Sequence, residues 1–173
     1  MKLKEKIKID FEDFFATGKF DFLKLGKTKD WVINNFPDPD GFAEHPEVFK
    51  DDIWIYGNIE LHFNNDELFL IFSDYINELE GGDSLELQKW FLTDTEKLKL
   101  SDVISQLNNK HIDFQKKTNN IGQTTVNLEL QSGVGLGFFL EEKAEEDYKE
   151  FLKRCKNTSQ NEFRLGSFSL MRK

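Results

Sequence analysis

Residues 53–63, IWIYGNIELHF, decide the fold because apolar and polar side chains alternate along them. The odd positions hold Ile53, Ile55, Ile59, Leu61 and Phe63, and the even positions hold Trp54, Tyr56, Asn58, Glu60 and His62. This period of two predicts a β-strand, or two strands bent near Gly57. A turn over residues 64–66 then predicts that residues 67–75 return as a neighbouring antiparallel strand.

Helices and further strands are expected on both sides of this stretch. The expected helices cover residues 11–16, Thr28–Phe36 (ended by Pro37), 101–110 and 142–155, and the expected strands cover residues 113–118, 125–131, 134–141 and 163–170. A chain of 173 residues is the usual length of one domain. The sequence therefore predicts a single α+β domain, 1–173, with antiparallel sheets packed on helices.

The two halves of the chain share a pattern that suggests a tandem helix-plus-sheet duplication. The tripeptide at residues 23–25, Leu-Lys-Leu, recurs at 98–100, a spacing of 75 residues. At the same spacing, residues 59, 61 and 63 correspond to Val134, Leu136 and Phe138. The pseudo-repeats would span about 22–80 and 97–156 and form one curved surface. Chance remains the alternative.

Composition favours a protein partner over nucleic acid or a membrane. The 32 acidic and 23 basic residues give a net charge of −9, which repels phosphates and suits a basic protein. The charge could also serve solubility alone. No stretch approaches 18 apolar residues, the N-terminus lacks the apolar segment of a signal peptide, and Cys155 has no disulfide partner. We therefore expect a cytoplasmic protein.

Motifs that would carry catalysis or bind a cofactor are weak in this sequence. The glycines at 133, 135 and 137 lead into an apolar strand, whereas a phosphate loop opens a helix. The acidic stretch 38–47 lacks the register of a calcium loop, and the three histidines lack zinc-ligand spacing. Cys155 lies on the apolar face of an expected helix, as a buried thiol would. We expect no catalytic residue, metal or cofactor, and hence no enzyme.

One face of the expected sheet has the composition of a binding surface. If Ile53, Ile59, Leu61 and Phe63 face the core, the other face carries large rings among polar groups, as protein interfaces do. The expected contact residues are Trp54, Tyr56, Glu60, His62 and Phe69, joined by Ile71, Asn127, Glu129 and Phe139. The carboxylates of Asp38, Asp40, Glu44, Glu47, Glu60 and Glu129 would steer a basic partner. Alternatively, the segment 11–22 or the C-terminal tail covers this face.

Several of these segments together resemble a known family. They are Leu25-Gly26, Val32, Phe36-Pro37-Asp38, Trp54-Ile55-Tyr56-Gly57 and Glu60-Leu61-His62-Phe63. The pattern is similar to bacterial immunity proteins encoded beside polymorphic or contact-dependent toxins, and to the helix-and-sheet repeat of the β-lactamase-inhibitor-protein fold. It covers residues 22–76, and 98–141 more weakly, because the second half lacks the proline and the Trp-x-Tyr-Gly strand.

The resemblance implies that the protein neutralises a cognate toxin, a basic protein domain, by stoichiometric binding without a cofactor. Two other classes of function stay open. One is a scaffold or regulatory binding module unrelated to toxins. The other is a small-ligand carrier or enzyme with a pocket between sheet and helices, which a deep pocket with convergent polar groups would indicate.

Overall fold

The structure is a computed structural model that describes residues 5–43, 53–118 and 124–172. Its α-helices are α1 (Phe11–Thr17), α2 (Lys29–Asn35), α3 (Leu100–Asn109) and α4 (Tyr148–Asn157). Its strands are β1 (Ile7–Asp10), β2 (Gly41–Ala43), β3 (Ile53–Tyr56), β4 (Ile59–Asn64), β5 (Glu67–Ser73), β6 (Leu85–Gln88), β7 (Phe114–Thr118), β8 (Thr125–Leu130), β9 (Val134–Phe139) and β10 (Arg164–Met171). The predicted α+β class is confirmed.

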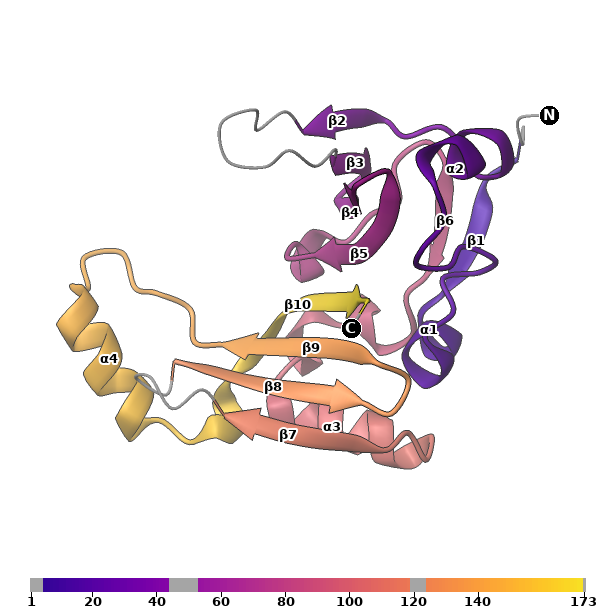
Figure 1. Ribbon diagram of the computed structural model, residues 1–173. Coiled ribbons are helices and arrows are strands. Elements are labelled where there is room, and N and C mark those ends of the chain that lie inside the picture. The colour runs from indigo at the N-terminus through magenta and orange to yellow at the C-terminus, as the bar shows by residue number, and fades with distance from the viewer. Residues whose placement is uncertain (1–4, 44–52, 119–123, 173) are drawn as a thin grey trace.

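Most strands join one curved antiparallel sheet. Its eight strands run in the order β2-β3-β4-β5-β10-β9-β8-β7, and β1 and β6 form a separate parallel pair (Figure 1). The centre of the large sheet is the antiparallel pair of β5 and β10, in which Ile71 lies opposite Leu170. Each half of the sheet therefore consists of four neighbouring strands, and the C-terminal strand completes the second half.

The two segments that match at a spacing of 75 residues occupy corresponding strands. Residues 59–63 lie in β4, and residues 134–138 lie in β9. Both strands lie directly next to the central β5–β10 pair, on opposite sides of it. Helix α2 precedes β2–β5 in the chain, and α3 precedes β7–β9. The duplication itself stays a prediction.

Side chains at the helix ends explain where the helices begin. The Asp10 carboxylate accepts from the backbone N–H groups of Glu12 and Asp13, and α1 starts there. The Thr28 hydroxyl caps α2 by accepting from the N–H of Trp31, as expected. Helix α4 starts at residue 148, later than the expected 142, because the Asp147 carboxylate accepts from the N–H of residue 150.

The core lies between one face of the large sheet and the segments α1–α3, β1 and β6. Phenylalanine rings dominate it around α1, where Phe11 and Phe14 are fully buried against Phe168 of β10. Their ring centroids lie 5.4 and 5.7 Å from that of Phe168 in edge-on contacts. Each buried ring contributes on the order of 1.5–3 kcal/mol. Helix α1 is thereby held against the strand at the centre of the sheet.

The prediction that Trp54 and Tyr56 face away from the core is wrong. Trp54 pairs with Leu61 and Tyr56 pairs with Ile59, and all four side chains are buried. The reason is the two-residue turn between β3 and β4, begun by Gly57 at φ +62°. Directly opposite residues share a face, so this turn places the even positions of β3 beside the odd positions of β4.

Ile71 was also expected on the accessible face, and this prediction is wrong. It lies opposite Leu61 and is fully buried. The pairing of β4 and β5 shifts register between His62 and Phe63, so β5 carries an additional residue near Phe69. Alternation along β5 is interrupted there, and Leu68 and Ile71 both reach the core.

Candidate functional site

One face of the eight-stranded sheet is accessible to solvent, and we call it the open face. Its residues are Ile55 of β3, Glu60 and His62 of β4, Leu70 and Phe72 of β5, Ser167, Ser169 and Met171 of β10, Gly135, Gly137 and Phe139 of β9, Asn127 and Glu129 of β8, and Gln115 and Lys117 of β7. All except Gly137 are half-buried or exposed, whereas the alternating residues of β4, β8 and β9 are buried. One face of the sheet is thus exposed to solvent, and the other is buried.

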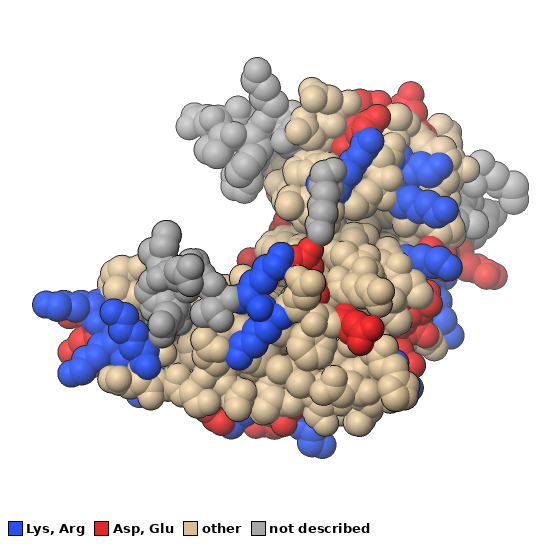
Figure 2. Space-filling view, turned by 60° about the horizontal axis from the view of Figure 1, so that its bottom comes forward, with Lys and Arg blue, Asp and Glu red and all other residues tan. Residues whose placement is uncertain are grey.

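The possibility that α1 or the C-terminal tail covers this face does not hold in the structure. Phe11, Phe14 and Phe15 of α1 contact Phe168, whose side chain is fully buried on the core face. The tail forms β10 inside the sheet. Figure 1 shows α1, α2, β1 and β6 together on one side of the molecule, and Figure 2 shows a broad uncharged tract beside an indentation between two lobes.

The β3–β5 half of the open face is apolar around the hydrogen-bonded side chains of Glu60 and His62. Leu70 and Phe72 lie opposite His62 and Glu60 across the β4–β5 pairing. The His62 Nε2 atom lies 2.7 Å from the Glu60 Oε2 atom, and the Phe72 ring meets the imidazole edge-on with centroids 6.2 Å apart. An ionised carboxylate only accepts hydrogen bonds, so Nε2 of His62 is the donor. The pair is thus enclosed by apolar side chains.

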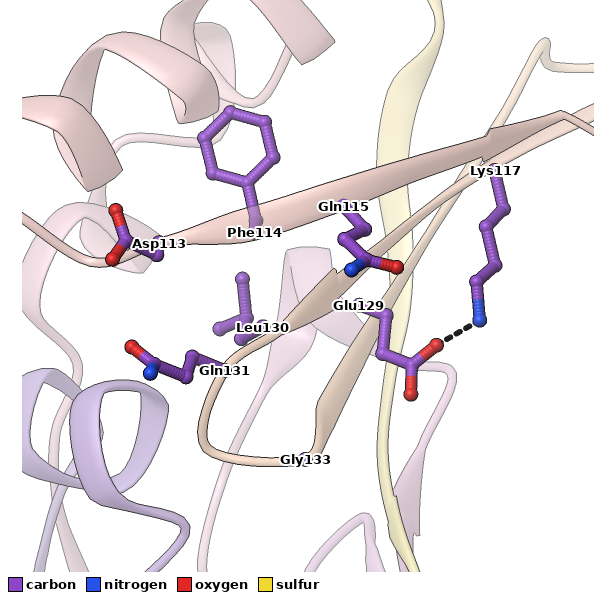
Figure 3. A pocket seen from close by; sticks show the side chains of 8 residues that line it. All are labelled: Asp113, Phe114, Gln115, Lys117, Glu129, Leu130, Gln131 and Gly133. Carbon is purple, nitrogen blue, oxygen red and sulfur yellow. Dashed lines mark hydrogen bonds and ion pairs between the residues drawn. The ribbon is translucent and has the colours of Figure 1, made fainter.

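The β7–β8 half of the open face is a polar trough of about 620 Å³ (Figure 3). In Figure 3, Gln115, Lys117 and Glu129 project toward one side of the two strands, and a dashed line joins Lys117 to Glu129. Asp113 and Gln131 line its end, and Gly133 lies at the turn below. These carboxylate, amide and ammonium groups can donate and accept hydrogen bonds.

Small residues separate the two halves along β9 and β10. Gly135 lies opposite Ser169, and Gly137 lies opposite Ser167. A Cβ atom on Gly137 would lie within 2.4 Å of the Ser167 Oγ atom, so this position is too tight for a larger residue. The result is a second hollow of about 390 Å³ at the middle of the sheet. At its end the ring of Phe139 lies close to Gly137.

Six of the nine predicted contact residues lie on or beside the open face, including Asn127 and Phe139, and three do not, of which Ile71 has been described above. Glu60, His62 and Glu129 belong to it, and Phe69 contacts the His62 ring with centroids 6.2 Å apart. Trp54 and Tyr56 are buried in the core instead, because of the parity of the β3–β4 turn.

The Tyr56 hydroxyl is part of the core hydrogen bonding. It donates to the backbone oxygen of Pro37 at 2.9 Å. Burial raises the pKa of Tyr56 well above its ordinary value, and the carboxylates of Asp38 and Asp40 raise it further. The ring is therefore held neutral and inside the protein.

The predicted steering carboxylates are distributed differently from expectation. The Asp40 carboxylate accepts from the N–H of Gly57 at 2.5 Å and from the N–H of Asp83 at 3.0 Å. It therefore holds the β3–β4 turn against the loop that precedes β6. Asp38 is exposed, and its backbone oxygen accepts from the Ser84 hydroxyl. The predicted residues Glu44 and Glu47 lie outside the described residues.

Sequence reasoning missed the apolar members of the open face. Ile55 is absent from the expected contact residues, although locating the two-residue turn after Tyr56 would have placed it on the open face. Leu70 and Phe72 were not predicted on this face, because the register shift within the β4–β5 pair interrupts the alternation of side chains along β5. Met171 could not be found from a local pattern, because it faces Leu70 only once β10 joins β5.

The remaining candidate groups are Cys155 and the metal-ligating side-chain types within residues 5–43, 53–118 and 124–172. Three or more His, Cys, Asp or Glu side chains do not come together there in a metal-binding arrangement. Cys155 is buried, and burial raises the pKa of its thiol, which disfavours the reactive thiolate. In the same described part of the chain, each helix is too short or too polar to cross a membrane.

The open face is a broad, shallow surface with an apolar half, a polar half and small residues between them. A surface of this shape can bury a large area against another macromolecule, whereas small-molecule sites are concave and enclose most of the ligand. Comparison of the chain with models of protein families, with curated proteins and with solved structures finds no match.

Proposed function

We propose that this protein neutralises a cognate bacterial toxin in the cytoplasm by binding it stoichiometrically through the open face. The observation that carries the proposal is the accessible apolar half of that face, since the other face of the sheet is already buried by the protein itself. The likeness of residues 22–76 to immunity proteins supports the choice of a toxin as partner. The proposal assigns no catalytic step to the chain.

The side chains of the open face suit the centre of a protein–protein interface. Aromatic residues and methionine are enriched in such centres, and Phe72, Phe139 and Met171 supply them here. Phe139 is 41% exposed and Met171 is 57% exposed, so both have surface left to bury. The side chains of Gln115 and Gln131 in the trough can form the hydrogen bonds that surround an interface core.

The net charge of −9 supports a basic partner. Glu60 and Glu129 lie on the open face itself, and the exposed Asp38 lies near its β3–β4 end. An exposed carboxylate at the rim of an interface, such as that of Asp38, accelerates association more than it slows dissociation. Added salt should therefore reduce the association rate constant more than it raises the dissociation rate constant.

The experiment uses the protein encoded next to this gene as the binding partner. Co-expression should abolish its toxicity, and titration calorimetry should give one equivalent at saturation. The variant Phe72→Ala should weaken binding about thirtyfold or more, as truncation of a central aromatic residue does. The matched control is Phe22→Ala, which removes a ring of 41% exposure that packs on Phe36 at the helix side.

Circular dichroism must show that both variants are folded. If folded Phe72→Ala binds as tightly as the parent, the open face is not the interface. If the neighbouring protein is neither toxic nor bound, the toxin assignment is wrong.

A further inference from the structure

The Glu60–His62 pair is a polar site within the apolar half of the open face. Glu60 keeps 29% of its side-chain surface exposed and His62 keeps 17%. Phe72 lies directly opposite Glu60 on β5, and Ile55 lies opposite it on β3. The imidazole of His62 bonds Oε2 of Glu60, and within the described part of the chain Oε1 accepts no hydrogen bond. One carboxylate oxygen is thus available to a partner.

Docking of a partner on the apolar half would remove this carboxylate from water. Burying a carboxylate with one oxygen left without a hydrogen bond costs free energy that the apolar contacts around it do not return. A partner that binds here must therefore bring a cation or strong donors to Oε1.

We propose that the toxin presents an arginine to Glu60, so that the guanidinium pairs with the carboxylate and its flat face covers the Phe72 ring. This inference rests on the proposed function and names the chemistry of the partner at the open face. The remaining carboxylate of this face, Glu129, already pairs with Lys117. Glu60 is therefore the group whose charge is left for a partner to complement.

Arginine fits the site better than lysine for geometric reasons. Its planar fork donates two parallel hydrogen bonds to a carboxylate, and it is less strongly hydrated than an ammonium group. A carboxylate oxygen has two acceptor sites, so Oε2 can keep the His62 bond and still accept from the fork. Guanidinium groups also stack on aromatic faces, and Phe69 and Phe72 lie beside the imidazole at 6.2 Å.

The first test probes the free protein with small molecules. N-acetyl-arginine amide should shift the amide NMR signals of Glu60, His62 and Phe72, and the uncharged isostere N-acetyl-citrulline amide should not. Glu60→Gln keeps the shape and an acceptor oxygen but removes the charge, and it should abolish these shifts. The matched control, Glu86→Gln, removes an exposed carboxylate of the separate β1–β6 pair and should leave them intact. Equal shifts with citrulline amide, or no shift at the three residues, would overturn the arginine site.

The second test uses the toxin encoded next to this gene. It separates the arginine contact at Glu60 from the proposal that the open face is the interface. Glu60→Gln should weaken toxin binding about thirtyfold or more, because loss of one partner from a buried charge pair mainly speeds dissociation. Binding that falls with Phe72→Ala but not with Glu60→Gln would refute the arginine anchor and leave the open face as the interface. Binding that is unchanged in both folded variants would refute the proposed interface itself.

Discussion

Replacing Tyr56 by phenylalanine tests the corrected face assignment of β3. The tyrosine ring is fully buried, and its hydroxyl donates to the Pro37 carbonyl at 2.9 Å. The substitution keeps the ring and removes one oxygen atom, so packing changes little. It deletes the hydrogen bond and leaves the buried Pro37 carbonyl without its donor.

The size of the effect follows from these two losses. A neutral intramolecular hydrogen bond contributes about 0.5–1.5 kcal/mol net, and an unsatisfied buried acceptor adds to the cost. We expect the free energy of unfolding to fall by about 1–2 kcal/mol. For a chain of this length, each kcal/mol lowers the melting temperature by about 2–4 °C. The affinity for a partner should stay unchanged, since Tyr56 does not reach the open face.

Urea denaturation followed by tryptophan fluorescence measures this change, with Tyr148→Phe as the matched control. Tyr148 is 71% exposed, so loss of its hydroxyl should leave the midpoint where it is. The slope of the transition should be the same in all three proteins, because the folded states bury the same surface. Equal midpoints for Tyr56→Phe and the parent would refute the buried hydrogen bond. If a folded Tyr56→Phe variant no longer binds the partner protein, the corrected face assignment is refuted.

Three further predictions concern the turn, the acid stability and the sheet edge. Gly57→Ala should lower the free energy of unfolding by about 2 kcal/mol or more, because φ is +62° and a Cβ would lie 2.4 Å from the Glu80 carbonyl oxygen. Gly41→Ala, where a Cβ meets nothing within 4 Å, should change it by less than about 0.5 kcal/mol. A hydrogen bond from an arginine lowers the pKa of Glu146 from 4.5 to about 2. A carboxylate whose pKa is lower in the folded than in the unfolded state stabilises the folded protein at pH values above the unfolded pKa. Near pH 6 the urea midpoint of the parent should therefore exceed that of Glu146→Gln. This difference should disappear as the pH falls from 4.5 to about 2. Lys116 lies on the edge strand β7, directly opposite the core residue Leu128 of β8. The variant Lys116→Val should form dimers or larger species, detected by light scattering, because a charged residue on an edge strand prevents pairing with another chain. An unchanged monomer fraction would show that the lysine does not protect this edge.

The sequence predicted the elements whose signals are local. The start of α2 near Thr28 and the strands of residues 125–131 and 134–141 were predicted close to their observed positions, because helical spacing and alternation act over a few residues. The side chains of β3 were assigned to the wrong face because the two-residue turn was not located. This turn places the even positions of β3 on the same face as the odd positions of β4. A correct strand prediction therefore does not by itself tell which side chains a partner can reach.

The composition of the open face depended on contacts between distant segments. The additional residue near Phe69 exists only relative to β4, and no local pattern marks it. Met171 reaches the surface beside Leu70 through the pairing of β10 with β5. Charge alone also misled, since Asp40 was counted as a steering group although its carboxylate holds two backbone N–H groups.

The position of β10 at the centre of the sheet has a consequence for how the chain folds during synthesis. Ile71 is made long before Leu170, the residue that will lie opposite it. Until residues 164–171 have left the ribosome, β5 has a free edge with apolar side chains on both faces. Such an edge pairs readily with other chains, and contacts between distant residues form slowly. The interval between translation of β5 and of β10 is therefore when nascent chains of this protein are most prone to aggregate and most in need of a chaperone.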